Sequence, residues 1–531
     1  MGSHFDVVII GSGAGGATLA QRLAPTGKSI LILERGAHLP REAQNWDPRA
    51  VFLQHRYRTT DQWWDRKGHP FTPNSYYWVG GNTTFYGACL MRLRGRDFEE
   101  TKRDGGVSPA WPIRLSDLAP YYDEAERLWQ VHGARGEDPT ENGDEPPYAF
   151  PAVSHDPGVA RLKAHWEGQG WKPFSLPLGV KLDEADPVTS TCIKCKTCGG
   201  YPCLLRAKCD ARTLAIEPLL GAANVTLLTG RKAIRLETDG SGKTVTTVVC
   251  QTAQGEERWS GDIVVAAAGA ANTAALLLAS ASPTHPNGLA NGSDQVGRNY
   301  MFHTLTAVVS LCATPVDVTF PKTLAVNDFY WGDPRGGYDL PMGHIQMLEY
   351  MSGQTLEGEI SEWIPPALVP GPLAGAVAER LLSMLVISED LPSPDNRIRL
   401  GTDGRVFLDY QHGAIDAHER LVKTLLQSLE GFVDHAHPIS QAHLELDSLL
   451  PLYGTAHQNG TVRFGADPKS SVLDSWCKAH ELDNLYVVDT SFFVSSAAVN
   501  PTLTTVANAM RVGDHLIERL RARAPAIPDP A

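Results

Sequence analysis

The sequence predicts an α/β protein in which a doubly wound, mostly parallel sheet is intertwined with an α+β domain built on an antiparallel sheet. Three observations predict this fold. A strand, a glycine turn, a helix and a second strand follow one another within residues 5–34, which is typical of a βαβ unit. Strand-like apolar runs between residues 225 and 268 are expected to return to the parallel sheet. Alternating apolar runs between residues 303 and 450 are typical of antiparallel strands.

The composition is that of a globular protein large enough for two domains. The chain has 531 residues, of which 42% are hydrophobic and 20% charged, so it can bury a large cofactor. A net charge of −13 and the absence of lysine and arginine blocks argue against nucleic-acid binding. No apolar run is long enough to cross a bilayer, and residues 7–16 lack the basic segment and cleavage site of a signal peptide. We therefore predict a cytoplasmic protein with no membrane span.

The first predicted strand, residues 5–10, ends at a glycine-rich turn. Gly11-Ser-Gly13-Ala-Gly-Gly16 fits the pattern G-x-G-x-x-G, in which the glycines make the turn, admit a pyrophosphate and allow close helix packing. Glu34 ends the next strand, near the expected interval of about 20 residues, where a carboxylate binds a ribose and repels a 2′-phosphate. The pattern predicts an FAD or NAD site and disfavours NADP. A glycine turn without a ligand is the alternative.

The later elements are predicted from apolar periodicity. A helix is expected within Trp111–His132, and a small-residue helix at Ala271–Ser280. The strands expected in the middle of the chain are Val225–Glu237, Val245–Gln251 and Asp262–Ala268. The expected antiparallel strands and their flanking amphipathic stretch are Leu305–Leu311, His344–Tyr350, Arg397–Leu400, Val406–Tyr410 and Asp416–His435. The proline-stiffened insertion Gln354–Leu382 is either a substrate lid or a surface loop packed on a helix at Leu373–Leu382.

Three further regions resemble the glucose–methanol–choline (GMC) oxidoreductase family, and with the glycine turn they span nearly the whole chain. Val79-Gly-Gly-Asn-Thr-Thr-Phe-Tyr-Gly-Ala-Cys-Leu-Met-Arg92 is similar to the family's Gly-Gly flavin loop. Residues 262–280, with Ala267-Ala-Gly-Ala270 at their centre, resemble its second signature, although Asn272-Thr273 stands in place of the usual Ser/Thr-Pro pair. The C-terminal blocks follow in family order, namely Ala456–Gly465, Asn484–Asp489 and Ala498–Ala507.

This resemblance implies FAD rather than NAD, and an active site formed by His457 and Asn500. The implied FAD-binding residues are Gly11, Gly13, Ala14, Gly16, Glu34, Arg35, Gly80, Gly81, Thr84, Tyr86, Gly87, Ala88, Ala233, Ala268, Gly269, Asp489, Pro501, Thr502 and Leu503. The Gly-Gly loop has Phe85 and Tyr86 but no histidine that could form a covalent link, so we expect non-covalent FAD.

The domain boundaries follow from the same segments. The Rossmann-like FAD-binding domain is expected to comprise residues 1–100, 205–300 and 451–520. The substrate domain is expected to comprise residues 101–204 and 301–450, with a cysteine-rich loop at 191–211 and the possible lid at 354–382. Residues 521–531 are expected to form a loose tail.

The reaction implied is oxidation of an alcohol to a carbonyl compound. His457 can take the hydroxyl proton because imidazole titrates near neutral pH, Asn500 can donate a hydrogen bond to the developing oxyanion, and hydride passes to flavin N5. Family breadth makes a polyol, sugar or glycosylated compound the expected substrate, and oxygen, a quinone-like molecule or a protein the electron acceptor. A flavin-containing lyase or a protein that only binds flavin remains an alternative. His303, His344 and His435 are expected to be structural.

Five of the nine cysteines lie close together in the sequence, at Cys192, Cys195, Cys198, Cys203 and Cys209. The first three resemble part of a ferredoxin-type run, but the interval to Cys203 is longer and no proline follows it. An iron–sulfur cluster that passes electrons to a partner, a structural zinc ion, buried thiols and local disulfide bridges all remain open. We assign no metal.

Overall fold

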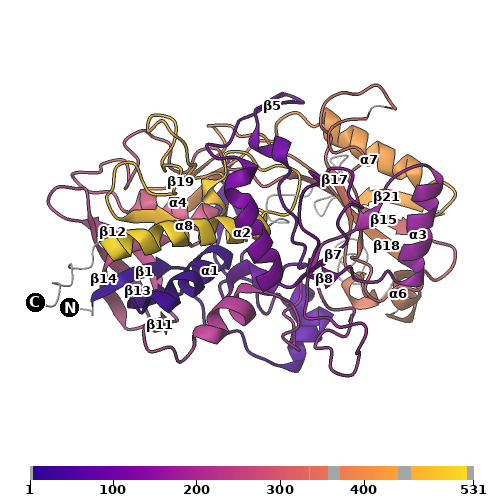
Figure 1. Ribbon diagram of the computed structural model, residues 1–531, viewed down its shortest axis with the longest axis horizontal. Helices are drawn as coiled ribbons and strands as arrows, with labels where there is room; N and C mark the ends of the chain where they lie inside the picture. The colour runs from indigo at the N-terminus through magenta and orange to yellow at the C-terminus, as the bar shows by residue number, and fades with distance from the viewer. Residues whose placement is uncertain (1–3, 334, 357–370, 434, 440–455, 523–531) are drawn as a thin grey trace, which may run out of the picture.

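The computed structural model describes residues 4–333, 335–356, 371–433, 435–439 and 456–522. Figure 1 shows a mostly parallel sheet with helices α1 (Ala14–Leu23) and α8 (Thr502–Ala522) at one end of the molecule. Within this sheet, β13 (Val245–Thr252) pairs antiparallel with β12 (Lys232–Thr238) and β14 (Gly255–Ala266). The antiparallel sheet lies at the other end with α3 (Pro157–Gly168) and α7 (Asp416–Ser428), and α2 (Leu115–Leu128) lies between the two. The predicted α/β fold with a separate antiparallel sheet is confirmed.

The first sheet has seven strands, in the order β11-β2-β1-β14-β13-β12, with β22 also paired to β14. Their bounds are β1 His4–Ile10, β2 Ile30–Leu33, β11 Val225–Leu228, β12 Lys232–Thr238, β13 Val245–Thr252, β14 Gly255–Ala266 and β22 Leu485–Val487. Val7 of β1 lies opposite Ile30 and Ile263 of the parallel strands on either side. These central strands are continuous apolar runs, and residues 7–10 and 30–33 are buried, as is typical of parallel strands that are covered on both faces.

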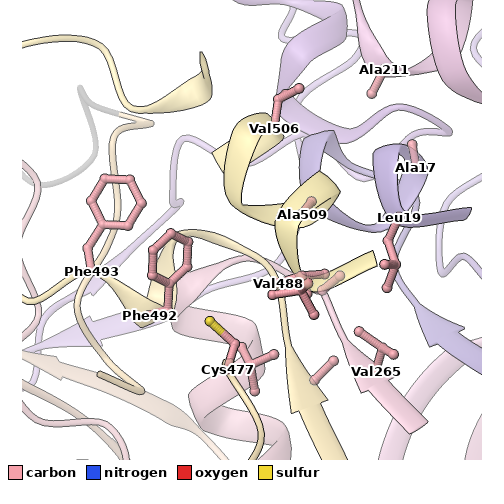
Figure 2. Close-up of a cluster of buried hydrophobic side chains, with 14 of the residues drawn as sticks. Ala17, Leu19, Ala211, Val265, Cys477, Val488, Phe492, Phe493, Val506 and Ala509 are labelled. Atoms are coloured by element: carbon pink, nitrogen blue, oxygen red, sulfur yellow. The ribbon is translucent and has the colours of Figure 1, made fainter. Parts of the chain in front are cut away.

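Helices α1 and α8 pack together over this sheet. In Figure 2, Ala17 and Leu19 of α1 and Val506 of α8 belong to one buried cluster, with Val265 of β14 below them. The approach is close because α1 carries glycine: a Cβ atom at Gly15 would lie 2.0 Å from the backbone oxygen of Val488. The helix start is thereby held against the ends of the strands, where ligands of such sheets bind.

The second sheet has six strands, in the order β21-β15-β18-β17-β16-β9. Their bounds are β9 Phe174–Ser175, β15 Thr304–Leu311, β16 Leu324–Val326, β17 His344–Met347, β18 Leu381–Ser388 and β21 His435–Ile439. Helix α7 covers one face and buries Leu421 and Leu425 in a cluster with Val308 and Val386. The remaining helices and strands are α4 Ala270–Ala279, α6 Gly371–Ala378, β3 Trp63–Asp65, β4 Pro70–Phe71, β5 Thr101–Arg103, β6 Gly106–Ser108, β7 Val131–Gly133, β8 Phe150–Pro151, β10 Leu178–Gly179, β19 Arg397–Leu400 and β20 Val406–Asp409.

Two of the predicted antiparallel strands were assigned to the wrong sheet. Strands β19 and β20 form a separate four-stranded sheet with β3 and β4, in which β20 pairs in parallel with β3. An alternating pattern identifies a strand but not the strand with which it pairs. Here the partner of β20 is β3, which lies in the first hundred residues, and these were predicted to belong to the other domain.

Some element boundaries also differ from the predictions. The single strand expected at 225–237 is two strands, β11 and β12, separated by a turn in which Gly230 has φ of +70°. Leu381 and Leu382 begin β18 rather than ending a helix. Residues 357–370 of the possible lid lie outside the described residues. Among the helices that are described, none combines the length and apolar character needed to cross a membrane.

Candidate active site

A cavity of about 920 Å³ is lined by residues from both the parallel and the antiparallel sheet. Its size is near the upper end of the roughly 300–1,000 Å³ that is usual for ligand pockets. It begins at the turn after β1, beside Gly11 and Gly13, and extends to His457 and Asn500. The predicted site residues that line it are Gly11, Gly13, Ala14, Glu34, Arg35, Gly81, Tyr86, Gly87, Ala233, Ala268, Gly269, His457, Asp489, Asn500, Pro501 and Thr502.

The other five predicted residues lie behind the cavity wall and support it. A Cβ atom at Gly16 would lie 2.2 Å from the backbone oxygen of Gly11, so this glycine lets α1 pack against the turn. The N–H group of Gly80 donates to Ser12 Oγ at 3.1 Å, and Thr84 Oγ1 donates to the Gly81 oxygen at 2.8 Å. Ala88 and Leu503 are fully buried in the core.

At one end of the cavity, the Glu34 carboxylate is held in place by the glycine turn. It accepts hydrogen bonds from Ser12 N at 3.0 Å and Ser12 Oγ at 2.6 Å through one oxygen, and from Gly36 N at 2.8 Å through the other. A Cβ atom at Gly13 would have no described atom within 4 Å. The turn therefore leaves open space beside the start of α1, where an anionic group is stabilised.

Asp489 joins the start of α4 to the segment that follows β22. Its carboxylate accepts hydrogen bonds from Gly269 N at 2.9 Å and from the Thr273 hydroxyl, and Ser491 N donates to it at 2.9 Å. Burial raises the pKa of Asp489 above its ordinary value. These bonds fix the backbone around Gly269, which lines the cavity.

At the far end of the cavity, His457 and Asn500 meet. Asn500 Nδ2 lies 3.5 Å from His457 Nε2, although the two residues are 43 positions apart. Asn500 is 8% exposed, and its Oδ1 atom has no hydrogen-bond partner in the described part of the chain. An amide oxygen without a partner beside a cavity is suited to a ligand that donates a hydrogen bond.

His303 adds a second imidazole to this pair. His303 Nε2 lies 3.0 Å from the backbone oxygen of Ser496, which can only accept, so this nitrogen carries the proton in neutral His303. His303 Nδ1 is then an acceptor, and it lies 3.0 Å from His457 Nδ1. Neutral His457 must therefore carry its proton on Nδ1. Its Nε2 atom, next to Asn500, is left with the lone pair that a base needs.

Burial keeps both imidazoles neutral. It lowers the pKa of His303 to about 4, and it lowers the pKa of His457 well below the ordinary value, with further lowering from the charges of His303 and Lys322. The expectation that His303 is only structural overlooked this contact. The sequence offered no signal for it, because the two histidines are 154 positions apart.

Sequence reasoning also missed a charged pair in the cavity wall. Lys322 Nζ lies 2.6 Å from Glu349 Oε1, and both residues line the cavity. The attraction of Lys322 lowers the pKa of Glu349 despite the opposing effect of burial, which is the largest single cause. Neither residue stands in a motif, so only the fold brings them to the site.

The cysteine-rich loop lies directly behind this wall. All nine cysteines are free thiols, so the local disulfide bridges left open by the sequence are not present. The described residues contain no group of three or more His, Cys, Asp or Glu side chains placed to share a metal ion. Cys203 Sγ accepts a hydrogen bond from Ala207 N at 3.3 Å, and Lys208 Nζ donates to the Cys198 oxygen at 2.6 Å.

Comparison with known proteins identifies the family. Residues 409–509 match the family model described as GMC oxidoreductase, and residues 6–305 match the model described as FAD dependent oxidoreductase. The chain is 32% identical to a 6'''-hydroxyparomomycin C oxidase of Streptomyces lividus, over 98% of this chain and 92% of that protein. The chain belongs to the GMC oxidoreductase family. It is also 32% identical to a paromamine 6'-oxidase of Streptomyces fradiae, over 96% of this chain and 90% of the relative.

Solved structures show the same GMC fold. A pyridoxine 4-oxidase from Mesorbium loti has a TM-score of 0.65 at 18% identity and covers 96% of this chain and 99% of its own. A formate oxidase of Aspergillus oryzae has a TM-score of 0.67 at 18% identity, over 98% and 99% of the two chains. The protein is thus an FAD-dependent GMC oxidoreductase that acts on alcohol groups. The open space at Gly13, the volume of the cavity and the Asn500 oxygen, which has no partner among the described residues, fit a bound dinucleotide.

Proposed function

We propose that this enzyme oxidises a hydroxyl group of an amino sugar, or of a glycoside that contains one, to a carbonyl group with His457 as the base. The observation that carries the proposal is the contact of His457 Nε2 with Asn500 in the wall of the cavity that Glu34 also lines. The substrate class rests on the two relatives at 32% identity, whose names refer to paromamine and to a hydroxyparomomycin.

The chain's residues would act on the alcohol as follows. His457 Nε2 takes the hydroxyl proton, while Asn500 Nδ2 donates a hydrogen bond to the oxygen as it gains negative charge. The residues around Gly13, Glu34 and Asp489 would hold FAD, which would supply the acceptor for the hydride that leaves the carbinol carbon. The alcohol loses one proton and one hydride, and the C–O bond becomes a double bond.

We also propose oxygen as the electron acceptor, because both of these relatives are named oxidases. A quinone-like molecule or a protein is the alternative. The absence of histidine at Phe85 and Tyr86 supports non-covalent FAD, which acid precipitation would release into the supernatant. The cytoplasmic location remains a prediction from the sequence, and cell fractionation would test it.

An anaerobic screen tests the function. The holoenzyme is mixed with paromamine, 2-methyl-1,2-propanediol, D-fructose or gluconate, and the flavin absorbance near its visible maximum is followed. We expect paromamine to bleach the flavin and added oxygen to restore the colour. Conversion of an alcohol without any bleaching would support the lyase alternative, and colour that returns only with a quinone would exclude oxygen as the acceptor.

A further inference from the structure

Lys322 and Glu349 form an ion pair in the wall of the cavity. Lys322 precedes β16 and Glu349 follows β17, so the antiparallel sheet supplies both residues. Lys322 is only 7% exposed, and its Nζ atom lies 2.6 Å from Glu349 Oε1. Removing two charges from bulk water is costly, and well-packed apolar residues would often be at least as stable in the same place. Because this pair is costly to bury and lies in the wall of the active site, we expect it to have a role in binding.

Two glycines let the backbone close around this pair. A Cβ atom at Gly87, in the flavin loop, would lie 1.8 Å from Lys322 Nζ. A Cβ atom at Gly199, in the cysteine-rich loop, would lie 1.7 Å from Glu349 Oε1. Next to this contact, Lys196 Nζ lies 4.2 Å from the centre of the Tyr350 ring. The flavin loop and the cysteine-rich loop therefore fix the position of the carboxylate from two sides.

The pair lies within electrostatic range of the proposed base. The charge of Lys322 lowers the pKa of His457. In contrast, Arg35, which follows β2, and Arg231 and Lys232, at the start of β12, line the cavity near Glu34. A substrate that presents its hydroxyl group to His457 would thus meet Lys322 and Glu349 rather than those three cations. A partly buried carboxylate makes strong, charge-assisted hydrogen bonds with an ammonium group.

We propose that Glu349 binds a protonated amino group of the substrate, and that Lys322 holds the carboxylate and offsets part of its charge. This inference rests on the proposed function, since it specifies how the same site selects an amino sugar. Lys322 competes with the substrate's ammonium group for Glu349. The two residues should therefore have opposite effects on the affinity for a cationic substrate.

Charge-removing variants of the holoenzyme test the proposal. Paromamine is the cationic probe, and fully N-acetylated paromamine is the neutral probe with the same skeleton. The substrate concentration dependence of anaerobic flavin bleaching gives a Kd and a limiting rate for each. Glu349→Gln should raise the Kd for paromamine by about ten- to a hundred-fold, the effect of losing a hydrogen bond to a charged group. Lys322→Met should lower that Kd by roughly threefold or more, because an opposing charge is gone.

The double variant Lys322→Met with Glu349→Gln should give a Kd between those of the single variants. The Kd of the neutral probe should change by less than about threefold in all of them.

Flavin content and thermal unfolding check that each variant is folded. If Glu349→Gln does not hold flavin, the direction in which Lys322→Met changes the Kd for paromamine decides. The inference would be overturned if the two single variants shifted the Kd for paromamine in the same direction. It would also be overturned if the Kd values of both probes shifted equally, or if only the limiting rate changed. Failure of the unaltered enzyme to bleach with any alcohol would instead overturn the proposed function.

Discussion

At the scale of single residues, the proposed chemistry depends on one nitrogen atom, His457 Nε2. We expect His457→Ala to lower the limiting rate of anaerobic flavin bleaching by about a hundredfold or more, because general-base catalysis contributes roughly 10²–10⁴. Asn500→Ala should lower it less, since it removes one hydrogen bond to the developing oxyanion. Both variants should retain FAD, which visible absorbance would show. An unchanged bleaching rate in His457→Ala would exclude it as the base.

His303 is expected to be a positioning residue that sets the proton on His457 Nδ1. Its backbone φ is +74°, a region that Gly, Asn and Asp tolerate better than other residues. His303→Gly removes the ring and should slow bleaching by roughly ten- to a hundred-fold, less than loss of the base itself. His303→Asn keeps an acceptor for His457 Nδ1 and should recover most of the rate.

His303→Asp separates positioning from a purely structural role. Asp matches Asn in size and backbone tolerance, but its charge beside Nδ1 should raise the pKa of His457. Because the neutral ring is the active form, the acid limb of the pH–rate profile should move to higher pH in His303→Asp relative to His303→Asn. Lys322, which also lowers the pKa of His457, and its partner Glu349 are present in both variants, so their charges do not affect the comparison. Coincident profiles would show that His303 does not control this proton.

The sequence reveals some of these residues and not others, for a physical reason. Glu34 follows the glycine turn at the expected spacing, whereas His457 and Asn500 stand in segments that resemble GMC family motifs, and the structure places all three in one cavity. His303 and Lys322 act through contacts between distant segments, and no local pattern records which residues such contacts will join. Residues of this kind can be identified only when the fold is known.

At the scale of elements, two glycines at the start of α1 have different roles, Gly13 just before the helix and Gly15 in its first turn. A Cβ atom at Gly15 would lie 2.0 Å from the Val488 oxygen, whereas one at Gly13 would point into open space. Gly15→Ala should therefore destabilise the fold by about 1–3 kcal/mol through overpacking. Gly13→Ala should leave flavin-free stability within about 0.5 kcal/mol but weaken FAD binding, because the added methyl group occupies space beside the expected pyrophosphate.

Thermal unfolding with and without added FAD distinguishes the two glycine variants. Gly15→Ala should unfold at a lower temperature in both conditions, and Gly13→Ala should mainly lose the stabilisation that FAD gives. A Gly13→Ala protein with unaltered FAD affinity would contradict the position assigned to the pyrophosphate.

The position of a strand could be predicted where its apolar pattern determines whether one face or both faces are buried. The continuous apolar runs of β1 and β2 indicate strands covered on both faces, and they lie side by side as expected. Strands β19 and β20 were found as strands but placed in the wrong sheet, because their alternation suits any half-buried sheet. Their actual neighbour, β3, is a three-residue strand that is too short to produce a periodic signal.

At the scale of the whole molecule, stability should depend on pH through buried histidines such as His418. His418 joins α7 to the antiparallel sheet, with ring nitrogens 2.8 Å from Thr306 Oγ1 and 2.8 Å from Ser388 Oγ. Burial lowers its pKa from 6.5 to about 3. Between these values the unfolded chain binds a proton that the folded protein does not, so the contribution of His418 to stability falls as pH falls.

His418→Gln isolates this effect. The free energy of unfolding of the unaltered protein, relative to that of the variant, should decrease by up to about 1.4 kcal/mol per pH unit below pH 6.5. Taking the difference removes the contributions of groups whose effect on stability has the opposite pH dependence. Asp390 is one such group, because burial raises its pKa to about 7. Denaturant titrations at several pH values give the comparison. The same substitution at exposed His38 is the control, and its curve should run parallel to that of the unaltered protein.

The cavity takes its walls from opposite ends of the polypeptide. Gly11 and Gly13 are synthesised long before Asp489, Asn500 and Thr502, because the two groups of residues are far apart in the sequence. A nascent chain therefore has no complete pocket until the later residues have been added. Capture of the cofactor must follow the synthesis of these later residues, and a chain truncated before Asp489 would yield a colourless product.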